Sequence, residues 1–148
     1  MATPELPRAT QAYHRPKESD MSEAASHIIS WFEIPSTDFE RAVRFYETAL
    51  ATTLRRENIG GQPIGIFQYT EPATGGCIIH SPTAKPSADG VVVYLNAQPN
   101  VDAVLARVEK AGGKVQGPVI ELPQDIGYIG FFTDTEGNRI GLHSPKNA

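Results

Sequence analysis

The 148-residue chain has little cysteine, no long apolar segment and no excess of positive charge. Its one cysteine, Cys77, excludes an intramolecular disulfide and fits a reducing compartment. No apolar run approaches the roughly 20 residues that a membrane-spanning helix requires. A formal net charge of -4 gives no general attraction to nucleic acid or anionic lipid. We therefore expect a cytoplasmic protein with no nucleic-acid or membrane partner.

Several motifs of common enzyme classes are also missing from the sequence. There is no glycine-rich phosphate loop, no Gly-x-Ser-x-Gly nucleophile motif and no paired-cysteine zinc pattern. What the chain does contain is 40% hydrophobic and 20% charged residues, an ordinary balance for one globular core.

The N-terminal segment differs from the rest of the chain. Its first twenty residues, MATPELPRATQAYHRPKESD, combine prolines with mixed charges and contain no apolar central region or small-residue cleavage site. This composition is not that of a secretory signal, and it predicts a flexible tail over residues 1–26. Met21 is an alternative start of the native product, and a partner-binding arm is an alternative role for the tail.

The remaining chain contains one pattern twice. IGIFQYTEPATGGCIIHSP and IGFFTDTEGNRIGLHSP share their opening residues, and both end on His-Ser-Pro. Upstream of each, a strand rich in β-branched or aromatic residues leads into a helix. The strands are expected at 28–34 and 91–96. Thr37, followed by Glu40, is expected to cap the first helix, and Asn100 the second.

Short strands follow each helix. In the first half they are expected at 53–58, 63–70 and 76–81, and in the second at 114–120, 127–134 and 138–144. Each half is therefore β-α-β-β-β, and the fold class is α+β. We expect one domain over 27–146, with modules of about 27–84 and 89–146. Because one such unit leaves a sheet face uncovered, the two sheets should pair at their edges or curl into a cup with the helices outside.

The stretches WFEIPSTDFERAVRFYETAL, VVVYLN, VDAVLARVEKAGGKV and FFTDTEGNRIGLHSP resemble the vicinal oxygen chelate superfamily. This superfamily includes glyoxalase I, bleomycin-resistance proteins, fosfomycin-resistance enzymes and extradiol dioxygenases. The last stretch is similar to the hairpin that ends its members, with Thr135 where proline is common. The resemblance covers about residues 28–145. It is narrowest to glyoxalase-related proteins of unassigned activity, and it implies the two-module glyoxalase/bleomycin resistance fold.

The resemblance also implies where a metal would bind, because each module of the metal-using relatives supplies two ligands that point into the cup. Those positions fall on Trp31, near Ile78, near Val92 and on Gly141. None of these residues has a side-chain donor for a divalent ion. We therefore expect no cofactor, while a divalent metal held by other residues stays open. Cys77, next to Ile78, is expected to face the helices.

Two histidines related by the internal repeat are expected to point into the cup, on the side of the implied metal positions. Alternation along the strands places His80 with Ile78, and His143 with Gly141. They are either ligands of a shifted metal site, joined by Glu33, or residues at the rim of the cup.

Other polar and aromatic side chains on the same faces are candidates for ligand binding. Glu33 is either a general base or the partner of Arg139 in an ion pair. Trp31 either stacks on a planar ligand or fills space. Tyr94 and Asn96 either orient a ligand or satisfy nearby backbone groups.

Two functions follow from these features. The first is a metal-free apolar and aromatic cavity that binds a small organic molecule. The alternative is a glyoxalase-related lyase or isomerase, or another metal-dependent enzyme of the superfamily, with a non-standard ligand set. Whether the chain is an enzyme stays open at this point. Members of the superfamily often dimerise, and exposed strand edges favour pairing, so we expect a homodimer.

Overall fold

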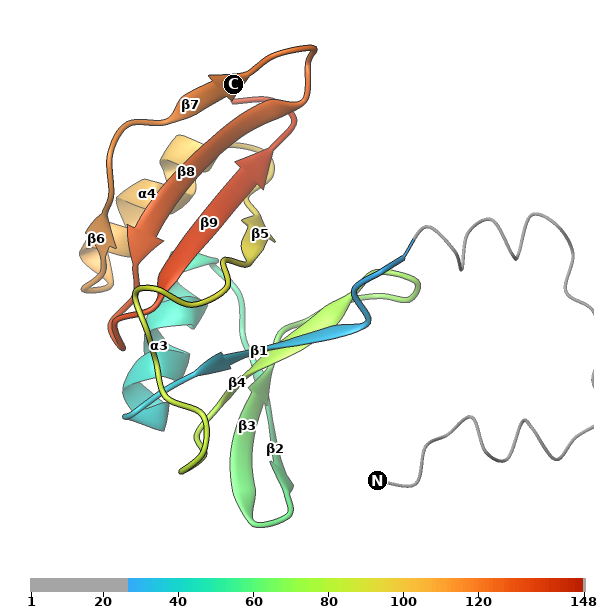
Figure 1. Cartoon of the computed structure of the whole chain (residues 1–148), viewed down its shortest axis with the longest axis vertical. Coiled ribbons are helices and arrows are strands. Elements are labelled where there is room, and N and C mark those ends of the chain that lie inside the picture. Colours follow the sequence, from blue (N-terminus) through green and yellow to red (C-terminus); the bar gives the residue numbers. More distant parts are fainter. Residues whose placement is uncertain (1–26, 148) are drawn as a thin grey trace, which may run out of the picture. The chain divides into compact units, whose positions relative to one another are not determined.

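The structure, a computed structural model, describes residues 27–147. The expectations for residues 1–26, a flexible tail and a start at Met21, lie outside the described residues. Figure 1 shows the elements in chain order. They are β1 (Trp31–Pro35), α3 (Phe39–Ala49), β2 (Arg55–Ile59), β3 (Gln62–Ile66), β4 (Gly75–Ile79), β5 (Tyr94–Asn96), α4 (Val101–Lys110), β6 (Lys114–Val115), β7 (Ile120–Leu122), β8 (Gly127–Thr133) and β9 (Arg139–Ser144).

The strands form two mixed sheets with matching topology, which confirms the expected α+β fold. In the first sheet the order is β1-β4-β3-β2, with β1 parallel to β4. In the second it is β5-β9-β8-β6, with β5 parallel to β9, and β7 pairs with β8. In both halves, therefore, the strand before the helix pairs with the last strand of its own module (Figure 1).

Of the two expected helix caps, the one at α4 is confirmed and the one at α3 is wrong. Asn100 caps α4, since its side chain accepts a hydrogen bond from the Ala103 amide at 2.9 Å. Asp38 caps α3 instead of Thr37, because it accepts from the Arg41 amide. The Thr37 amide and hydroxyl instead donate to the carboxylate of Glu136, which is distant in the sequence.

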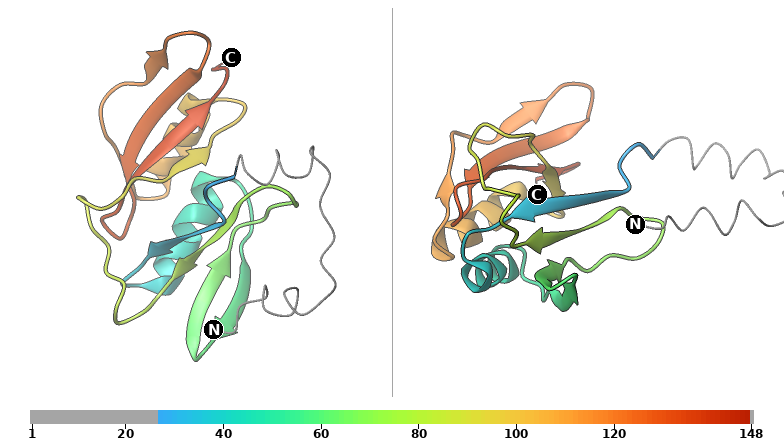
Figure 2. Two further views of the ribbon diagram at one scale, coloured as in Figure 1. Left: turned by 45° about the vertical axis from the view of Figure 1, so that its right-hand side comes forward. Right: turned by 60° about the horizontal axis from the view of Figure 1, so that its bottom comes forward.

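The main hydrophobic core is shared by the two modules. Helices α3 and α4 contact each other, and each covers one face of its own sheet (Figure 2). Phe45 of α3 lies 5.7 Å from Phe132 of β8, measured between ring centroids. The other fully or nearly fully buried members include Ile34, Val43, Tyr46, Ile78, Val101, Val108 and Leu142. Neither helix could bury its apolar stripe without the other module.

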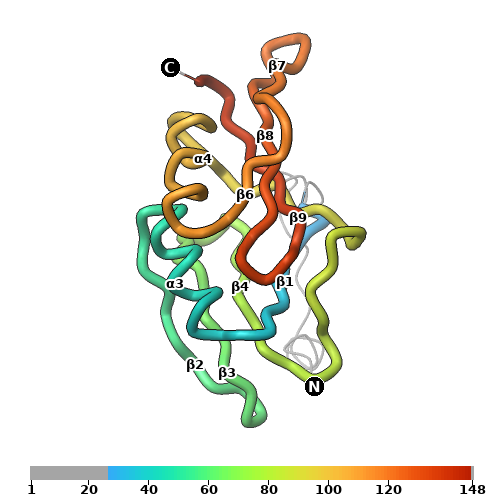
Figure 3. Tube along the Cα trace, turned by 90° about the vertical axis from the view of Figure 1, so that its left-hand side faces the viewer, coloured from blue at the N-terminus to red at the C-terminus, as the bar shows by residue number. Residues whose placement is uncertain are grey.

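A buried polar network joins the hairpin turn between β8 and β9 to the first module. The hydroxyl of Tyr46 donates to Asp134 at 2.5 Å, and the Asn138 side chain donates both to Asp134 and to the Pro35 carbonyl. Figure 3 shows this turn beside the start of α3. Since every buried polar side chain among the described residues has a partner, the network fixes the turn without an unsatisfied group.

Candidate functional site

Each sheet has one face against the helices and one face away from them. In the second sheet, Leu95 and Leu142 pair across β5 and β9 and belong to the core. The neighbouring pairs, Tyr94 with Gly141 and Asn96 with His143, must therefore point to the other face, because side chains alternate along a strand. Arg139 is also on this face. The structure thus brings together five residues whose shared facing was expected from the sequence.

In the first sheet, the predicted side is correct for Trp31 and Glu33 and wrong for Ile78 and Cys77. Trp31 and Glu33 lie away from the helices, as expected. Ile78 does not: it pairs with Ile34, and both are buried in the core against the helices. Cys77, expected to face the helices, instead pairs with Glu33 on the opposite face. Cys77 belongs to a second cluster of buried residues there, with Ile64 and Ile66, and the half-buried Ile79 packs against it.

The environment of Cys77 does not favour nucleophilic chemistry. Burial, reinforced by the charge of Glu33, raises the pKa of the thiol to about 11. The side chain is 1% exposed. Because the thiolate is the reactive form, Cys77 has neither the ionisation nor the access that a nucleophile needs.

The two repeated histidines do not form a common site. His80 follows the end of β4, and its Nδ1 donates to the Ser36 carbonyl at 3.0 Å. The Nε2 of His143 donates to the Ile126 carbonyl at 2.8 Å. The two rings line different pockets. His80 accordingly has the rim position that was the alternative to metal binding.

The expected ion pair between Glu33 and Arg139 is wrong. The ion pairs of the described residues join other side chains. Arg139 instead lies over the ring of Phe131, with its guanidinium carbon 4.2 Å from the ring centroid. Glu33 is exposed, so burial does not favour its use as a general base.

The donor set does not fit the metal that the resemblance implies. Trp31 and Gly141 lie on the faces away from the helices but carry no donor, Ile78 faces the core, and Val92 precedes β5. Within residues 27–147, no three His, Cys, Asp or Glu side chains gather closely enough to hold an ion. These residues therefore do not fit a divalent ion at the positions that the resemblance implies.

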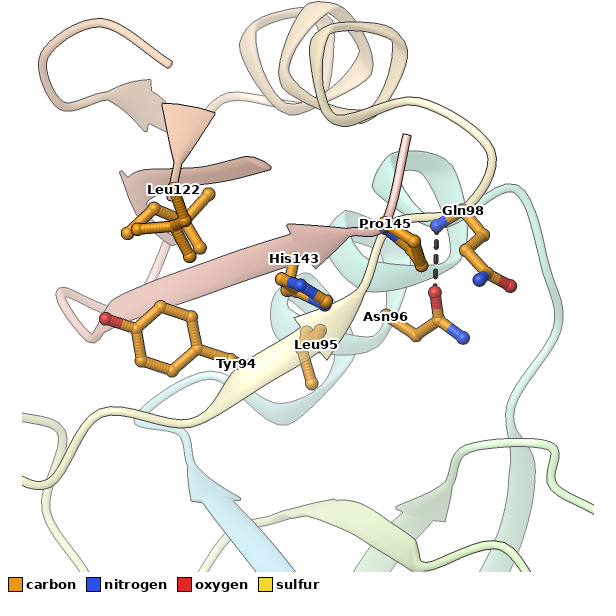
Figure 4. Close-up of a pocket in the computed structure, with 8 residues that line it drawn as sticks. Tyr94, Leu95, Asn96, Gln98, Leu122, His143 and Pro145 are labelled. Carbon is orange, nitrogen blue, oxygen red and sulfur yellow. Dashed lines mark hydrogen bonds between the residues drawn. The ribbon is translucent and has the colours of Figure 1, made fainter. Parts of the chain in front are cut away.

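The second sheet forms a pocket of about 640 Å³ on its face away from the helices (Figure 4). This volume is in the range of small-molecule sites. We call it the second-sheet pocket. Its lining residues come from β5, β7, β8, β9 and the segments after β5 and β9: Tyr94, Leu95, Asn96, Gln98, Leu122, Ile129, His143 and Pro145.

Tyr94 occupies the place next to Gly141 in this face. A Cβ atom at position 141 would lie 2.5 Å from Cδ2 of Tyr94, so only glycine permits the ring to lie across β9. The same ring meets Phe131 edge-on, with centroids 5.6 Å apart. Tyr94 remains 49% exposed. At this position, where the resemblance implies a metal ligand, Gly141 instead leaves room for the aromatic ring of Tyr94.

Sequence reasoning missed several residues of this face, of which Ile129 and Leu122 line the pocket and Phe131 supports Tyr94. The signal for two of them was present. Alternation along 127–134 places Ile129 and Phe131 on one side, and pairing with the last strand puts that side next to His143 and Gly141. The short strand with Leu122 gave no comparable pattern.

The chain belongs to the Glyoxalase/Bleomycin resistance protein/Dioxygenase superfamily, whose family profile matches residues 28–142. It is 33% identical over 114 residues to a glyoxylase-like domain-containing protein from Didymella fabae, an alignment that covers 74% of this chain and 88% of that protein.

Solved structures share the fold. A glyoxalase/bleomycin resistance protein from Albidiferax ferrireducens T118 matches with a TM-score of 0.60 at 20% identity, covering 78% of this chain and 97% of its own. One from Streptomyces sp. CB03234 has a TM-score of 0.57 at 26% identity, covering 78% and 99%. An antibiotic binding protein from the same organism has a TM-score of 0.55 at 24% identity, covering 82% and 97%.

Neither helix of the described chain has the length and apolar character needed to cross a membrane.

Proposed function

We propose that this protein binds a small, predominantly apolar organic molecule in the second-sheet pocket without using a metal. The pocket itself is the observation that carries the proposal. Its apolar lining, from Leu122, Ile129 and Pro145, meets the side chains of Tyr94 and Asn96 on one sheet face. Apolar walls with a few polar groups are typical of ligand sites.

Two further observations support binding ahead of metal-dependent chemistry. Glyoxalase-type catalysis depends on a metal that stabilises negative charge developing on the substrate, and the donor set described above does not fit one. In addition, a structural relative is an antibiotic binding protein. We extend only the class of activity, binding of a small organic molecule, to this chain.

Calorimetric titration of the purified protein with a panel of planar aromatic compounds tests the proposal. Tyr94→Ala removes the aromatic surface next to the pocket and should weaken binding about tenfold or more, as expected for loss of a ring that contacts the ligand. Tyr69→Ala is a matched control. Tyr69 is also an exposed tyrosine whose ring lies against a glycine, Gly75, but it lies between β3 and β4 of the first module and outside the second-sheet pocket.

The control also identifies a different site. If Tyr69→Ala weakens binding and Tyr94→Ala does not, the ligand binds next to Tyr69 in the first module and the proposal is wrong. The fluorescence of Trp31 would report a ligand bound next to Tyr69, because Trp31 is the only tryptophan and its ring centroid lies 6.2 Å from that of Tyr69.

Elemental analysis separates binding from the metal-dependent alternative. Protein purified without added metal should contain no stoichiometric zinc, nickel, iron or manganese. A stoichiometric ion that survives gel filtration, and that is lost on unfolding, would favour a lyase or isomerase with a non-standard ligand set.

The proposal includes a cytoplasmic homodimer. The single cysteine supports a reducing compartment. Each sheet ends in edge strands, such as β2 and β5, which favour association with another chain. Light scattering of the full chain at several concentrations tests the dimer, and a monomer mass at all of them would contradict it.

A further inference from the structure

The hydrogen-bonding state of His143 follows from its partner. Its Nε2 lies 2.8 Å from the carbonyl oxygen of Ile126. A carbonyl oxygen only accepts, so the hydrogen of the neutral ring is on Nε2. Nδ1 then carries a lone pair, and none of the hydrogen bonds described for residues 27–147 uses it. The side chain lines the second-sheet pocket (Figure 4).

The backbone around Ile126 is built for this contact. Gly127 follows it with φ of +121°, a conformation that favours glycine. A Cβ atom at position 127 would lie 3.0 Å from Nε2 of His143 and closer still to the Ser144 carbonyl oxygen. Only glycine therefore allows the Ile126 carbonyl and the imidazole to meet, and their contact fixes which ring nitrogen is free.

Asn96 is oriented in a similar way. Its Oδ1 accepts from the Gln98 amide at 2.9 Å, which leaves its NH₂ group as a donor (Figure 4). Asn96 is the partner of His143 in the pairing of β5 with β9. Neighbouring positions of one sheet face thus present a hydrogen-bond acceptor and a hydrogen-bond donor.

The pocket carries no fixed charge to balance a charged ligand. None of its lining residues is Asp, Glu, Lys or Arg. A charged group would lose hydration there without gaining a partner ion, which is unfavourable. The ligand class that matches is neutral, mostly apolar, and equipped with polar groups that can hydrogen-bond.

We propose that the second-sheet pocket selects planar neutral ligands that carry a hydroxyl or N–H group, whose hydrogen is accepted by Nδ1 of His143. A carbonyl or ether oxygen beside that group would accept from Asn96. This inference rests on the proposed binding function and adds to it the chemical feature that the site recognises.

Three probes of nearly the same shape test it: 2-naphthol, 2-methoxynaphthalene and naphthalene, titrated by calorimetry at pH 8, where an ordinary imidazole is neutral. The naphthol can donate a hydrogen bond, its methyl ether cannot, and naphthalene has no polar group. The wild-type protein should bind 2-naphthol about tenfold more tightly than the ether, the ratio expected for one hydrogen bond to a group that is otherwise unpaired.

His143→Phe should remove this preference while naphthalene still binds. His143→Gln, which keeps an acceptor oxygen, should restore part of it. His80→Phe is the matched control, since His80 is the repeat-related histidine, donates to a different carbonyl and lies outside this pocket. It should leave the preference unchanged.

The outcomes separate this inference from the function on which it rests. Equal affinity of the wild-type protein for 2-naphthol and its ether overturns the role of His143 but leaves the pocket as a binding site. A preference that survives in His143→Phe overturns it as well. If none of the three probes binds, the pocket is not a site for planar aromatic molecules, and both proposals fail.

Discussion

The buried hydroxyl of Tyr46 is one of the groups that connect the two modules. It is fully buried and donates to Asp134 in the turn between β8 and β9. Burial, followed by the charge of Asp134, raises the pKa of Tyr46 well above its ordinary value, so the hydroxyl remains a neutral donor. Asp134 also accepts from the Asn138 side chain.

Tyr46→Phe tests the contribution of that hydrogen bond. It deletes the donor with little change in shape and should lower the free energy of unfolding by about 1–3 kcal/mol, the usual cost of leaving a buried carboxylate short of a partner. Urea unfolding measures it. Tyr94→Phe is the control, because the Tyr94 ring is half exposed and should lose less than about 0.5 kcal/mol. Equal effects of the two changes would contradict the role of Tyr46.

Cys77 gives a second test at the residue scale. Because it is 1% exposed and its pKa is raised to about 11, it should react with a disulfide reagent at pH 8 only when the fold opens. We expect the absorbance of released thiol to rise slowly in buffer and at once in 6 M guanidinium, a concentration that unfolds ordinary domains of roughly this size. Rapid stoichiometric labelling of the native protein would place Cys77 at the surface instead.

Helix α3 depends on a carboxylate from the other module. Glu136, in the turn between β8 and β9, accepts from the amides of Thr37 and Asp38 and pairs with Arg41 at 2.8 Å. The Glu136 side chain has no exposed surface. Burial alone would raise its pKa. The hydrogen bonds from Arg41 and the Asp38 amide outweigh burial and lower the pKa from 4.5 to about 2.

This shift predicts a pH dependence of stability. Since Glu136 binds its proton less tightly in the folded state, its stabilising effect is complete above about pH 4.5 and is lost as pH falls toward 2. The gap in unfolding free energy between the wild-type protein and Glu136→Gln should therefore close over that range. Urea unfolding at a series of pH values measures the gap. Glu57→Gln, at an exposed ion pair with Arg55, should show a small gap throughout.

The helix caps and the last strands of the two modules show what local sequence could predict and what it could not. Asn100 was predicted as a cap because its hydrogen bond reaches only three residues along the chain. For α3 the true cap, Asp38, makes the same kind of local hydrogen bond, to the Arg41 amide, but Thr37 next to it is also a good capping type, so the local sequence did not separate the two. The contact that Thr37 makes instead, with Glu136 of the other module, could not be predicted from local sequence. In β4 the sequence GGCII contains only glycines and apolar residues, so the alternation of polar and apolar residues could not show which side faces the core. The prediction therefore assigned Cys77 and Ile78 to the wrong faces. By contrast, RIGLHS alternates, and its facing was predicted.

At the scale of the molecule, the second-sheet pocket and the shared core depend on the same alternation. The face of β9 that packs on α4 contributes Ile140 and Leu142 to the core, and the other face contributes His143 to the pocket. A change that shifts the register of β9 by one residue would exchange these two sets. The core therefore fixes the orientation of the pocket residues.

Because one core serves both modules, residues 31–147 should unfold as one cooperative unit. Phe132, in the second module, is fully buried against Phe45 and Tyr46 of the first. Phe132→Ala should cost about 3–5 kcal/mol, the range for removing a large aromatic side chain from a core. Trp31, the only tryptophan, lies in the first module and reports on that module alone by fluorescence.

The decisive comparison is therefore between probes in different modules. In Phe132→Ala, the urea midpoint reported by Trp31 fluorescence should fall by the same amount as the midpoint reported by far-ultraviolet circular dichroism, which follows the helices and strands of both modules. If the modules folded independently, a cavity in the second would leave the Trp31 transition where it is in the wild-type protein. A shift of both midpoints together would mean that a substitution in the second module acts on the first, through the direct contact of Phe132 with Phe45 and Tyr46 of α3.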